Sequence, residues 1–209
     1  MAIVNNPQPS CELPTHKPSE LPLAQLDIAP GSSDPQHAVF AGGCFWCTEA
    51  VFEQIVGVSD VVSGYAGDIA QTANYEAVCG GGTNHAEAIR ITYDPSKVTF
   101  GQLLRVFFAT HDPTTKDRQG PDWGRQYRSA IFYQSDDEKR VAETYIKQLN
   151  DAKVFPRPIV TTLEPLTQFF PAEGYHQDFA RENPTHPYIR QQALPKVAKV
   201  REKFNEMVK

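Results

Sequence analysis

Short apolar runs, separated by loops rich in glycine and proline, set the pattern of the chain. The run at 37–41 is followed directly by Gly42 and Gly43, which predicts a buried strand that ends at a turn. Further runs with strand-like composition are bounded by turn residues. They predict strands at 58–65, 88–93, 127–133 and 159–163.

Helical spacing of apolar residues occurs between these strands. From Cys44 to about 56 the apolar positions follow one helix face, and Gly57 stands where that helix would end. Two capping-box patterns, which begin at Thr99 and Ser135, predict helices at 99–110 and 135–152. A short helix at 173–182 and a final helix from about 195 complete the pattern.

The irregular alternation of strands and helices bears on the fold class. Because several connections are long, a regular doubly wound parallel sheet is not required. We expect an α+β (mixed α/β) fold, a single compact domain with a mixed sheet flanked by helices, long irregular loops and extended tails. Residues 1–36 carry seven prolines and no hydrophobic period, which predicts an extended or poorly ordered N-terminal arm. The domain itself is expected to span 37–209 and to end in coil and a C-terminal helix.

Composition and charge narrow the possible functions. The chain has 209 residues, 40% of them hydrophobic, which suits one sizeable core. Its formal charge of -5 argues against binding to the phosphates of a nucleic acid. No run of about 18 apolar residues occurs, and the first residues lack the basic and apolar regions of a secretion signal. These features predict a cytoplasmic protein that needs no membrane.

The four cysteines are the first candidates for chemistry. They are too few for a disulfide scaffold in a chain of this length. Cys44 stands at the predicted start of a helix, where free N–H groups and the helix dipole stabilise a thiolate and lower the pKa of the thiol. The alternative is a buried, inert cysteine. Cys47 completes a C-x-x-C pair, and side chains three residues apart on a helix are neighbours.

A metal site is less well supported than a redox dithiol. A structural zinc site needs four ligands, and the chain has only one C-x-x-C pair. His85 and His111 stand at no recognised ligand spacing, and we expect both to be structural or loop-fixing residues. The sequence therefore predicts no metal.

Four motifs in order along the chain carry a resemblance to a known family. They are Gly43-Cys44-Phe45-Trp46, Gly82-Thr83-Asn84-His85-Ala86-Glu87, His111-Asp112-Pro113 and Gln126-Tyr127-Arg128-Ser129-Ala130. Together they closely resemble the peptide methionine sulfoxide reductase A family, from about 39 to about 183. The resemblance implies a mixed α/β fold, for which we expect a ferredoxin-like core. It also implies a reductase for the S epimer of methionine sulfoxide, acting on oxidised proteins and on the free amino acid.

The resemblance also assigns roles, residue by residue, to positions of this chain. Cys44 matches the family's nucleophile and Glu87 its acid. The sulfoxide site is matched by Tyr75, Asp122 and Tyr127, and the pocket for the substrate methyl group by Phe45 and Trp46. Each residue taken alone has a more common role. A residue like Glu87 is more often a surface charge, and one like Asp122 a turn former. Tyrosines such as Tyr75 and Tyr127 are more often half-buried sheet residues, and aromatics such as Phe45 and Trp46 more often fill the core.

The chemistry explains why such residue types are needed. A sulfoxide oxygen leaves poorly until it is protonated, so attack by a thiolate on the sulfur requires a proton donor at that oxygen. Glu87 can be that donor if burial raises the pKa of its carboxyl, and Tyr75 and Tyr127 can hydrogen-bond the same oxygen. Release of methionine would leave Cys44 as a sulfenic acid. No resident cofactor is needed, because a thiol such as thioredoxin can supply the electrons.

The recycling step is where the chain departs from the family. Many members have a small residue in place of Cys47 and recycle through cysteines in a C-terminal tail, whereas here no cysteine follows Cys79. We predict that Cys47 attacks the Cys44 sulfenic acid and that thioredoxin reduces the resulting disulfide. Direct attack of an external thiol on Cys44 is the alternative, and Cys11 could take part only if the arm folds back. Cys79 is expected to be a structural thiol. The protein is expected to be a monomer.

Two other classes of protein remain as alternatives. A general thiol–disulfide oxidoreductase would also use C-x-x-C, but it would have no use for an acid such as Glu87. A non-enzymatic metal-binding or interaction module would hold zinc tightly or have no thiolate at neutral pH.

Overall fold

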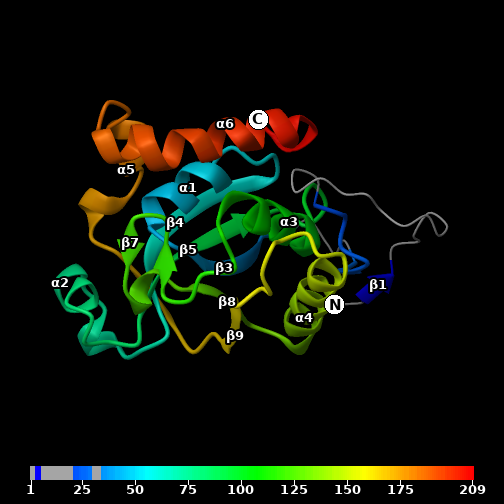
Figure 1. Cartoon of the computed structure of the whole chain (residues 1–209), viewed down its shortest axis with the longest axis horizontal. Coiled ribbons are helices and arrows are strands. Elements are labelled where there is room, and N and C mark those ends of the chain that lie inside the picture. Colours follow the sequence, from blue (N-terminus) through cyan, green and yellow to red (C-terminus); the bar gives the residue numbers. More distant parts are fainter. Residues whose placement is uncertain (1–2, 6–20, 30–33) are drawn as a thin grey trace.

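A six-stranded sheet forms the centre of the protein (Figure 1). The computed structural model describes residues 3–5, 21–29 and 34–209. The strands lie in the order β10-β4-β5-β3-β8-β9, and every neighbouring pair is antiparallel except β8 and β9, which run parallel. Their bounds are β3 Gln36–Gly42, β4 Val58–Ala66, β5 Ala86–Tyr93, β8 Ser129–Tyr133, β9 Thr162–Pro165 and β10 Phe169–Pro171.

Two helices complete the expected ferredoxin-like core. Helix α1 (Phe45–Phe52) connects β3 to β4, and α3 (Phe100–Thr110) connects β5 to β8. The four inner strands with these two helices give the order strand, helix, strand, strand, helix, strand along the chain. The prediction of one α+β domain with a mixed sheet and flanking helices is confirmed.

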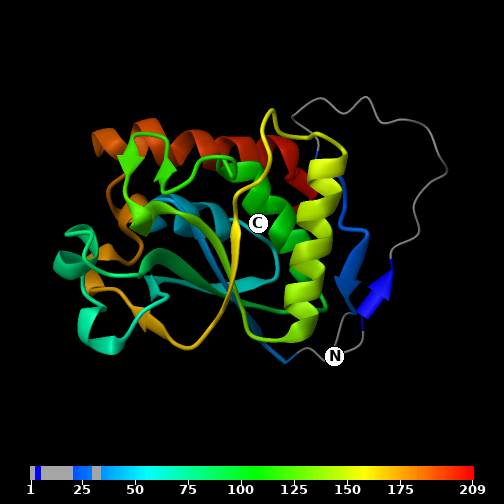
Figure 2. The same ribbon diagram turned by 60° about the horizontal axis from the view of Figure 1, so that its bottom comes forward.

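The remaining helices surround this core. Helix α4 (Asp136–Asp151) packs against α3 and β8, and α6 (Leu194–Lys203) lies over α1 and α3 (Figures 1 and 2). Two short helices, α2 (Tyr75–Cys79) and α5 (Phe179–Glu182), belong to long connections. None of the helices within 3–5, 21–29 and 34–209 combines the length and the apolar character that crossing a membrane requires.

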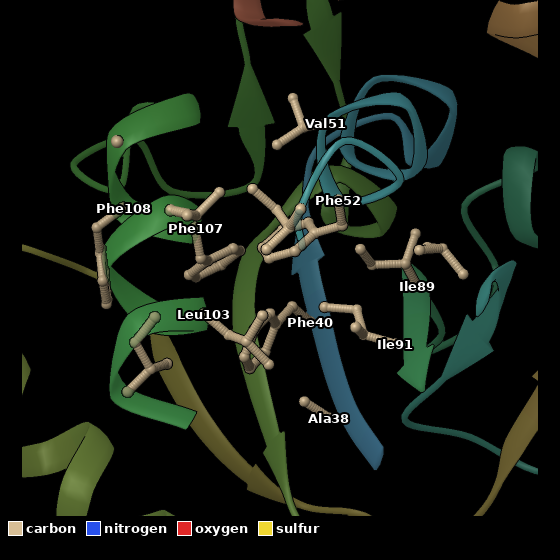
Figure 3. Close-up of a cluster of buried hydrophobic side chains, with 14 of the residues drawn as sticks. Ala38, Phe40, Val51, Phe52, Ile89, Ile91, Leu103, Phe107 and Phe108 are labelled. Carbon is tan, nitrogen blue, oxygen red and sulfur yellow. The ribbon is translucent and has the colours of Figure 1, made fainter. Parts of the chain in front are cut away.

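Aromatic side chains fill the space between the sheet and its helices. Phe40 of β3 lies 5.0 Å from Phe107 of α3 and 5.8 Å from Phe52 of α1, measured between ring centroids. Figure 3 shows side chains from β3, β5, α1 and α3 meeting in this cluster. Each fully buried side chain of this size stabilises the fold by about 1.5–3 kcal/mol. The helix that carries Cys44 at its start is therefore fixed by the burial of Val51 and Phe52 against the sheet and α3.

Several predicted elements differ from the observed ones at their ends. The first helix ends at Phe52 rather than near 56, and the strand expected at 159–163 lies at Thr162–Pro165. The helix expected at 173–182 is split into a 3-10 turn, Gly174–His176, and α5. The break comes at Asp178, whose φ of 57° is left-handed and cannot continue a helix. The final helix begins earlier than expected, with a π-helical turn at Ile189–Ala193.

Part of the N-terminal segment is described, and it packs on the domain. Strand β2 (Leu26–Ile28) lies against α3 and α4 and pairs with β1 (Ile3–Asn5). Leu21, Ala24 and Ile28 are buried there. Cys11 lies outside the described residues.

Candidate active site

A tight turn between β3 and α1 places Cys44. Gly43 has a φ of 90°, and a Cβ atom on it would lie 2.5 Å from the Cβ and Cγ atoms of Gln119. Only glycine fits both constraints. Cys44 follows as the N-cap residue of α1, and its carbonyl oxygen accepts from the N–H of Cys47 at 3.1 Å. The sequence prediction that Cys44 stands at a helix start is confirmed.

Cys44 and Cys47 are both buried, free thiols. Burial, then the hydrogen bond to Cys47 and the nearby Glu87 charge, raise the pKa of Cys44 well above its ordinary value. The same hydrogen bond lowers the pKa of Cys47, and the positive charge of Lys196 adds to that effect. The expectation that the helix start lowers the pKa of Cys44 is therefore wrong for the resting protein, because desolvation outweighs the helix dipole.

Glu87 lies at the same helix start. It comes from β5, where it pairs with Tyr65 of β4, and its side chain is only 3% exposed. One carboxylate oxygen, Oε2, accepts from the backbone N–H of Phe45 at 3.0 Å. Burial raises the pKa of Glu87 to about 8, and the charges of Asp122 and Cys47 act in the same direction. A carboxyl group that keeps its proton at neutral pH thus lies beside the amide that follows Cys44.

An aromatic wall borders the first turn of α1. Phe45 is fully buried, with its ring centroid 5.0 Å from that of His176. The Trp46 ring stacks on Phe179 at 3.9 Å, and its Nε1–H donates to His176 Nδ1 at 3.2 Å. Both rings are therefore held in fixed orientations by the segment that precedes and includes α5.

Two tyrosines and an aspartate reach the site from other elements. Tyr75 opens α2 and is 38% exposed, and a hydrogen bond to the Cys79 thiol is the main cause that raises its pKa to about 12. Tyr127 is half-buried on a 3-10 turn, and burial followed by the Glu87 charge raises its pKa. The Cys44 charge contributes to the pKa shifts of both tyrosines. Asp122 lies in β7 (Asp122–Trp123), which pairs with β6 (Arg118–Gln119).

The structure also brings to the site residues that the sequence reading missed. The Tyr188 hydroxyl donates to Asp122 Oδ2 at 2.5 Å and hydrogen-bonds the thiols of both active-site cysteines. His176 and Glu173 contact Trp46 and Tyr75 from the C-terminal third of the chain. No local pattern marks these residues, because each is brought in by a contact across many residues of sequence.

The two histidines considered as possible metal ligands have structural partners. His85 hydrogen-bonds the carbonyl of Ile69 at 3.0 Å through Nε2. His111 contacts the carbonyl of Phe107 and the hydroxyl of Ser129, each at 2.7 Å. Across the described parts of the chain, no three His, Cys, Asp or Glu side chains are grouped as metal ligands would be.

Comparisons with known proteins agree with this geometry. A sequence model of the family described as "Peptide methionine sulfoxide reductase" matches residues 36–208. The chain is 49% identical to "Peptide methionine sulfoxide reductase MsrA 2" of Synechocystis sp. over 193 residues, which cover 90% of each chain. It is 55% identical to the protein of the same name from Mesorhizobium japonicum, over 84% of this chain and 89% of the relative.

Solved structures with the same fold come from a yeast and a bacterium. The reduced form of Mxr1 from Saccharomyces cerevisiae matches with a TM-score of 0.65 and 35% identity, over 74% of this chain and 89% of Mxr1. Methionine sulfoxide reductase A of Corynebacterium diphtheriae matches with a TM-score of 0.64 and 32% identity, over 86% of this chain and 83% of that protein.

Proposed function

The chain belongs to the peptide methionine sulfoxide reductase family, and on this premise we propose that it reduces the S epimer of methionine sulfoxide to methionine. The substrates are oxidised methionine residues in proteins and the free amino acid. The observation that carries the proposal is the buried Glu87 carboxyl, which accepts from the Phe45 N–H beside the buried Cys44 thiol and whose pKa burial raises to about 8. A thiol–disulfide oxidoreductase would have no use for such an acid.

Substrate binding uses the aromatic wall and the polar groups opposite it. The methyl group of the substrate packs against Phe45 and Trp46, whose rings are held by His176 and Phe179. The sulfoxide oxygen points toward Glu87, Tyr75 and Tyr127, all of which carry a proton at neutral pH. Asp122, fixed by its bond to Tyr188, lines the rest of the site.

The first chemical step joins the Cys44 sulfur to the substrate sulfur. Cys47 can take the Cys44 proton, because the Cys44 thiol already donates to it. Glu87 gives its proton to the sulfoxide oxygen as the new sulfur–sulfur bond forms. The protonated oxygen then passes from the substrate sulfur to the Cys44 sulfur, as the sulfur–oxygen bond of the substrate and the new sulfur–sulfur bond both break. Methionine leaves as the thioether, and Cys44 becomes a sulfenic acid. Cys44 is oxidised by two electrons and the substrate sulfur is reduced by two.

The second step restores the thiol. The Cys47 sulfur attacks the Cys44 sulfenic acid, a disulfide forms between the two, and the oxygen leaves as water. Cys47 stands one helical turn from Cys44, so the reaction needs only a local adjustment of that turn. Thioredoxin, a dithiol, then reduces the disulfide.

The proposal extends to the setting of the enzyme. A catalytic domain at 37–209, with residues 1–36 as an N-terminal arm, agrees with the family match at 36–208. We place the enzyme in the cytoplasm, because a reducing compartment keeps Cys44 and Cys47 as the free thiols that the reaction requires. We also propose that it acts as a monomer.

Turnover of separated epimers tests the reaction. Peptides that carry the S or the R sulfoxide are incubated with dithiothreitol and either wild-type protein or Cys44→Ser. Methionine formation from the S peptide alone, lost in Cys44→Ser, is the expected result. Activity on neither epimer, together with reduction of insulin disulfides, would favour a general oxidoreductase.

Peptide mapping after a single turnover without reductant tests the recycling step. A disulfide bond between Cys44 and Cys47 is expected. Cys47→Ser should still release one methionine per enzyme, but its turnover with thioredoxin as the reductant should be slower than that of wild type. Full thioredoxin-dependent turnover in Cys47→Ser would instead mean direct attack of the external thiol on Cys44. Cys11→Ser distinguishes a contribution from the arm.

A further inference from the structure

The Glu173 carboxylate joins two tyrosines from separate elements. The Tyr65 hydroxyl of β4 donates to Oε2 at 2.9 Å, and the backbone N–H of Tyr75 donates to Oε1 at 2.9 Å. His176 Nε2 lies 3.8 Å from Oε2 of the same carboxylate. Although burial alone would raise the pKa of Glu173, the bonds from Tyr75 and Tyr65 hold it below its ordinary value. Glu173 is therefore a carboxylate at neutral pH, with each oxygen bonded to a different element.

Helix α2 has little else to hold it in place. It contains five residues, and Val78 is its only buried one. It lies at the edge of the molecule in both views (Figures 1 and 2). Asn74, the N-cap residue, caps the helix by accepting from the N–H of Ala77 at 3.0 Å. Because so short a helix is marginal alone, its position depends on contacts from outside, and the bond to Glu173 crosses 98 residues of sequence.

The same segment also fixes the opposite wall of the site. His176 accepts from the Trp46 indole, so its proton is on Nε2, which faces Glu173. The Tyr75 ring packs on His176, with centroids 4.7 Å apart. Residues 173–176 thus connect Trp46 on α1 with Tyr75 on α2, which share no element of secondary structure.

We propose that Glu173 is a positioning residue for the reaction, which holds the first turn of α2 over the site so that the Tyr75 hydroxyl reaches the sulfoxide oxygen. This inference rests on the proposed function. Glu173 does not touch the reacting atoms, and it acts through Tyr75. On substrate binding the Tyr75 hydroxyl exchanges its bond with the Cys79 thiol for one with the sulfoxide oxygen, while its backbone stays anchored.

A double-mutant cycle separates positioning from general stabilisation. The variants are Glu173→Ala, Tyr75→Phe and the pair, and the readouts are kcat and KM for the S-sulfoxide peptide with dithiothreitol. Glu173→Ala should lower kcat about 10-fold with little change in KM, because loss of position weakens a bond made in the transition state. In the Tyr75→Phe background the same substitution should change kcat less than about 2-fold.

Two matched variants complete the experiment. Glu173→Gln keeps an oxygen that can accept from the Tyr75 N–H, so it should recover most of the lost kcat. Glu76→Gln changes an exposed carboxylate on the same helix and should leave kcat unchanged. If Glu173→Ala lowers kcat by the same factor with and without the Tyr75 hydroxyl, or leaves kcat unchanged, the inference is wrong.

Amide hydrogen exchange supplies a readout that does not need activity. The Tyr75 N–H should exchange at least about 10-fold faster in Glu173→Ala than in wild type, since its acceptor is lost. Unchanged exchange would overturn the anchor itself. An inactive wild-type enzyme would instead count against the proposed function, while the exchange result would still stand.

Discussion

At the scale of single residues, Glu87 is the group whose protonation the chemistry depends on. Its pKa of about 8 means that the acid form dominates at pH 7 and is lost as the pH rises. We therefore expect the single-turnover rate of methionine formation to fall as the pH rises above about 8. Glu87→Gln should lower the rate at pH 7 by about 100-fold, because the oxygen then leaves without a proton donor.

The pH dependence of the variant identifies the group responsible. Glu87→Gln should lack the decline above pH 8, since glutamine does not titrate. Rates measured from pH 6 to pH 10 for both proteins make the comparison. The same decline in both would assign it to another group, such as a tyrosine of the site.

Glu49 is a buried carboxyl that the mechanism does not use. It lies on α1 two residues after Cys47 and is 1% exposed. Neither of its oxygens has a well-aligned partner among the described residues, although the backbone of Asp178 and the side chain of Ser63 lie near it. Burial raises its pKa to about 7. Between about pH 4.5 and pH 7 the folded protein therefore keeps a proton on Glu49 that the unfolded chain has lost. The free energy of unfolding declines as the pH rises through this range.

Replacing Glu49 tests this linkage. Relative to wild type, Glu49→Gln should gain on the order of 2 kcal/mol in free energy of unfolding between pH 5 and pH 8, because the substitution removes the buried charge. Urea titrations at the two pH values measure the difference. The exposed Glu143→Gln serves as the control, with no pH-dependent gain. A constant difference at both pH values would show that Glu49 titrates normally.

At the scale of elements, the sequence predicts best where the signal is local. The capping box at Thr99 is present as expected, and α3 begins one residue later. The Ser135 side chain caps α4, but Glu138 bonds the N–H of Gln134 instead of the N-cap residue. These helices are defined by residues a few positions apart, which a sequence pattern can report.

Elements defined by distant contacts were missed. Helix α2 and strand β10 are short, and a one-turn helix with one buried side chain leaves no periodic pattern. The same reason applies to the site. The motifs around Cys44 and Glu87 are local, whereas Tyr188 reaches Asp122 across 66 residues and Glu173 reaches Tyr65 across 108.

The turn before α1 is the element on which the site depends most directly. Gly43→Ala would put a Cβ atom 2.5 Å from Gln119 side-chain atoms, at a φ of 90° that alanine rarely adopts. We expect the free energy of unfolding to fall by about 2–3 kcal/mol and activity to drop, since Cys44 follows directly. Urea denaturation compares it with Gly82→Ala, where open space surrounds the new atom and little loss is expected. If Gly43→Ala lowers the free energy of unfolding as little as Gly82→Ala does, the turn tolerates a side chain.

At the scale of the whole molecule, the N-terminal segment shows what composition cannot predict. Its proline-rich sequence has no hydrophobic period, yet its described part is tied to the domain through its backbone. The carbonyls of Pro22 and Leu23 accept from Tyr145 and Gln148 of α4, at 2.8 and 2.9 Å. Such bonds depend on side chains far along the chain, so the segment's own pattern gives no sign of them.

Asp27 is the main polar anchor of this segment. It is buried, Oδ1 accepts from the N–H of Gly101 at 2.8 Å, and Oδ2 accepts from the Thr99 hydroxyl at 2.5 Å. Both donors belong to the start of α3, where free N–H groups and the helix dipole favour a negative charge. Strand β1, the partner of β2, lies at the opposite end of the molecule from α2 (Figures 1 and 2).

Loss of this anchor should therefore affect stability without affecting the reaction. Asp27→Ala removes the acceptor of three donors, the N–H groups of Ile28 and Gly101 and the Thr99 hydroxyl, so the free energy of unfolding should fall by about 2–4 kcal/mol. Asp27→Asn retains one acceptor oxygen and should lose less. The kcat for the S-sulfoxide peptide at 20 °C should stay within about 2-fold of wild type in both variants, because Asp27 bonds the start of α3, whereas Cys44 stands at the start of α1. An Asp27→Ala protein as stable as wild type would mean that Asp27 is not the main anchor. A folded Asp27→Ala protein that has lost activity would mean that the segment acts on the site.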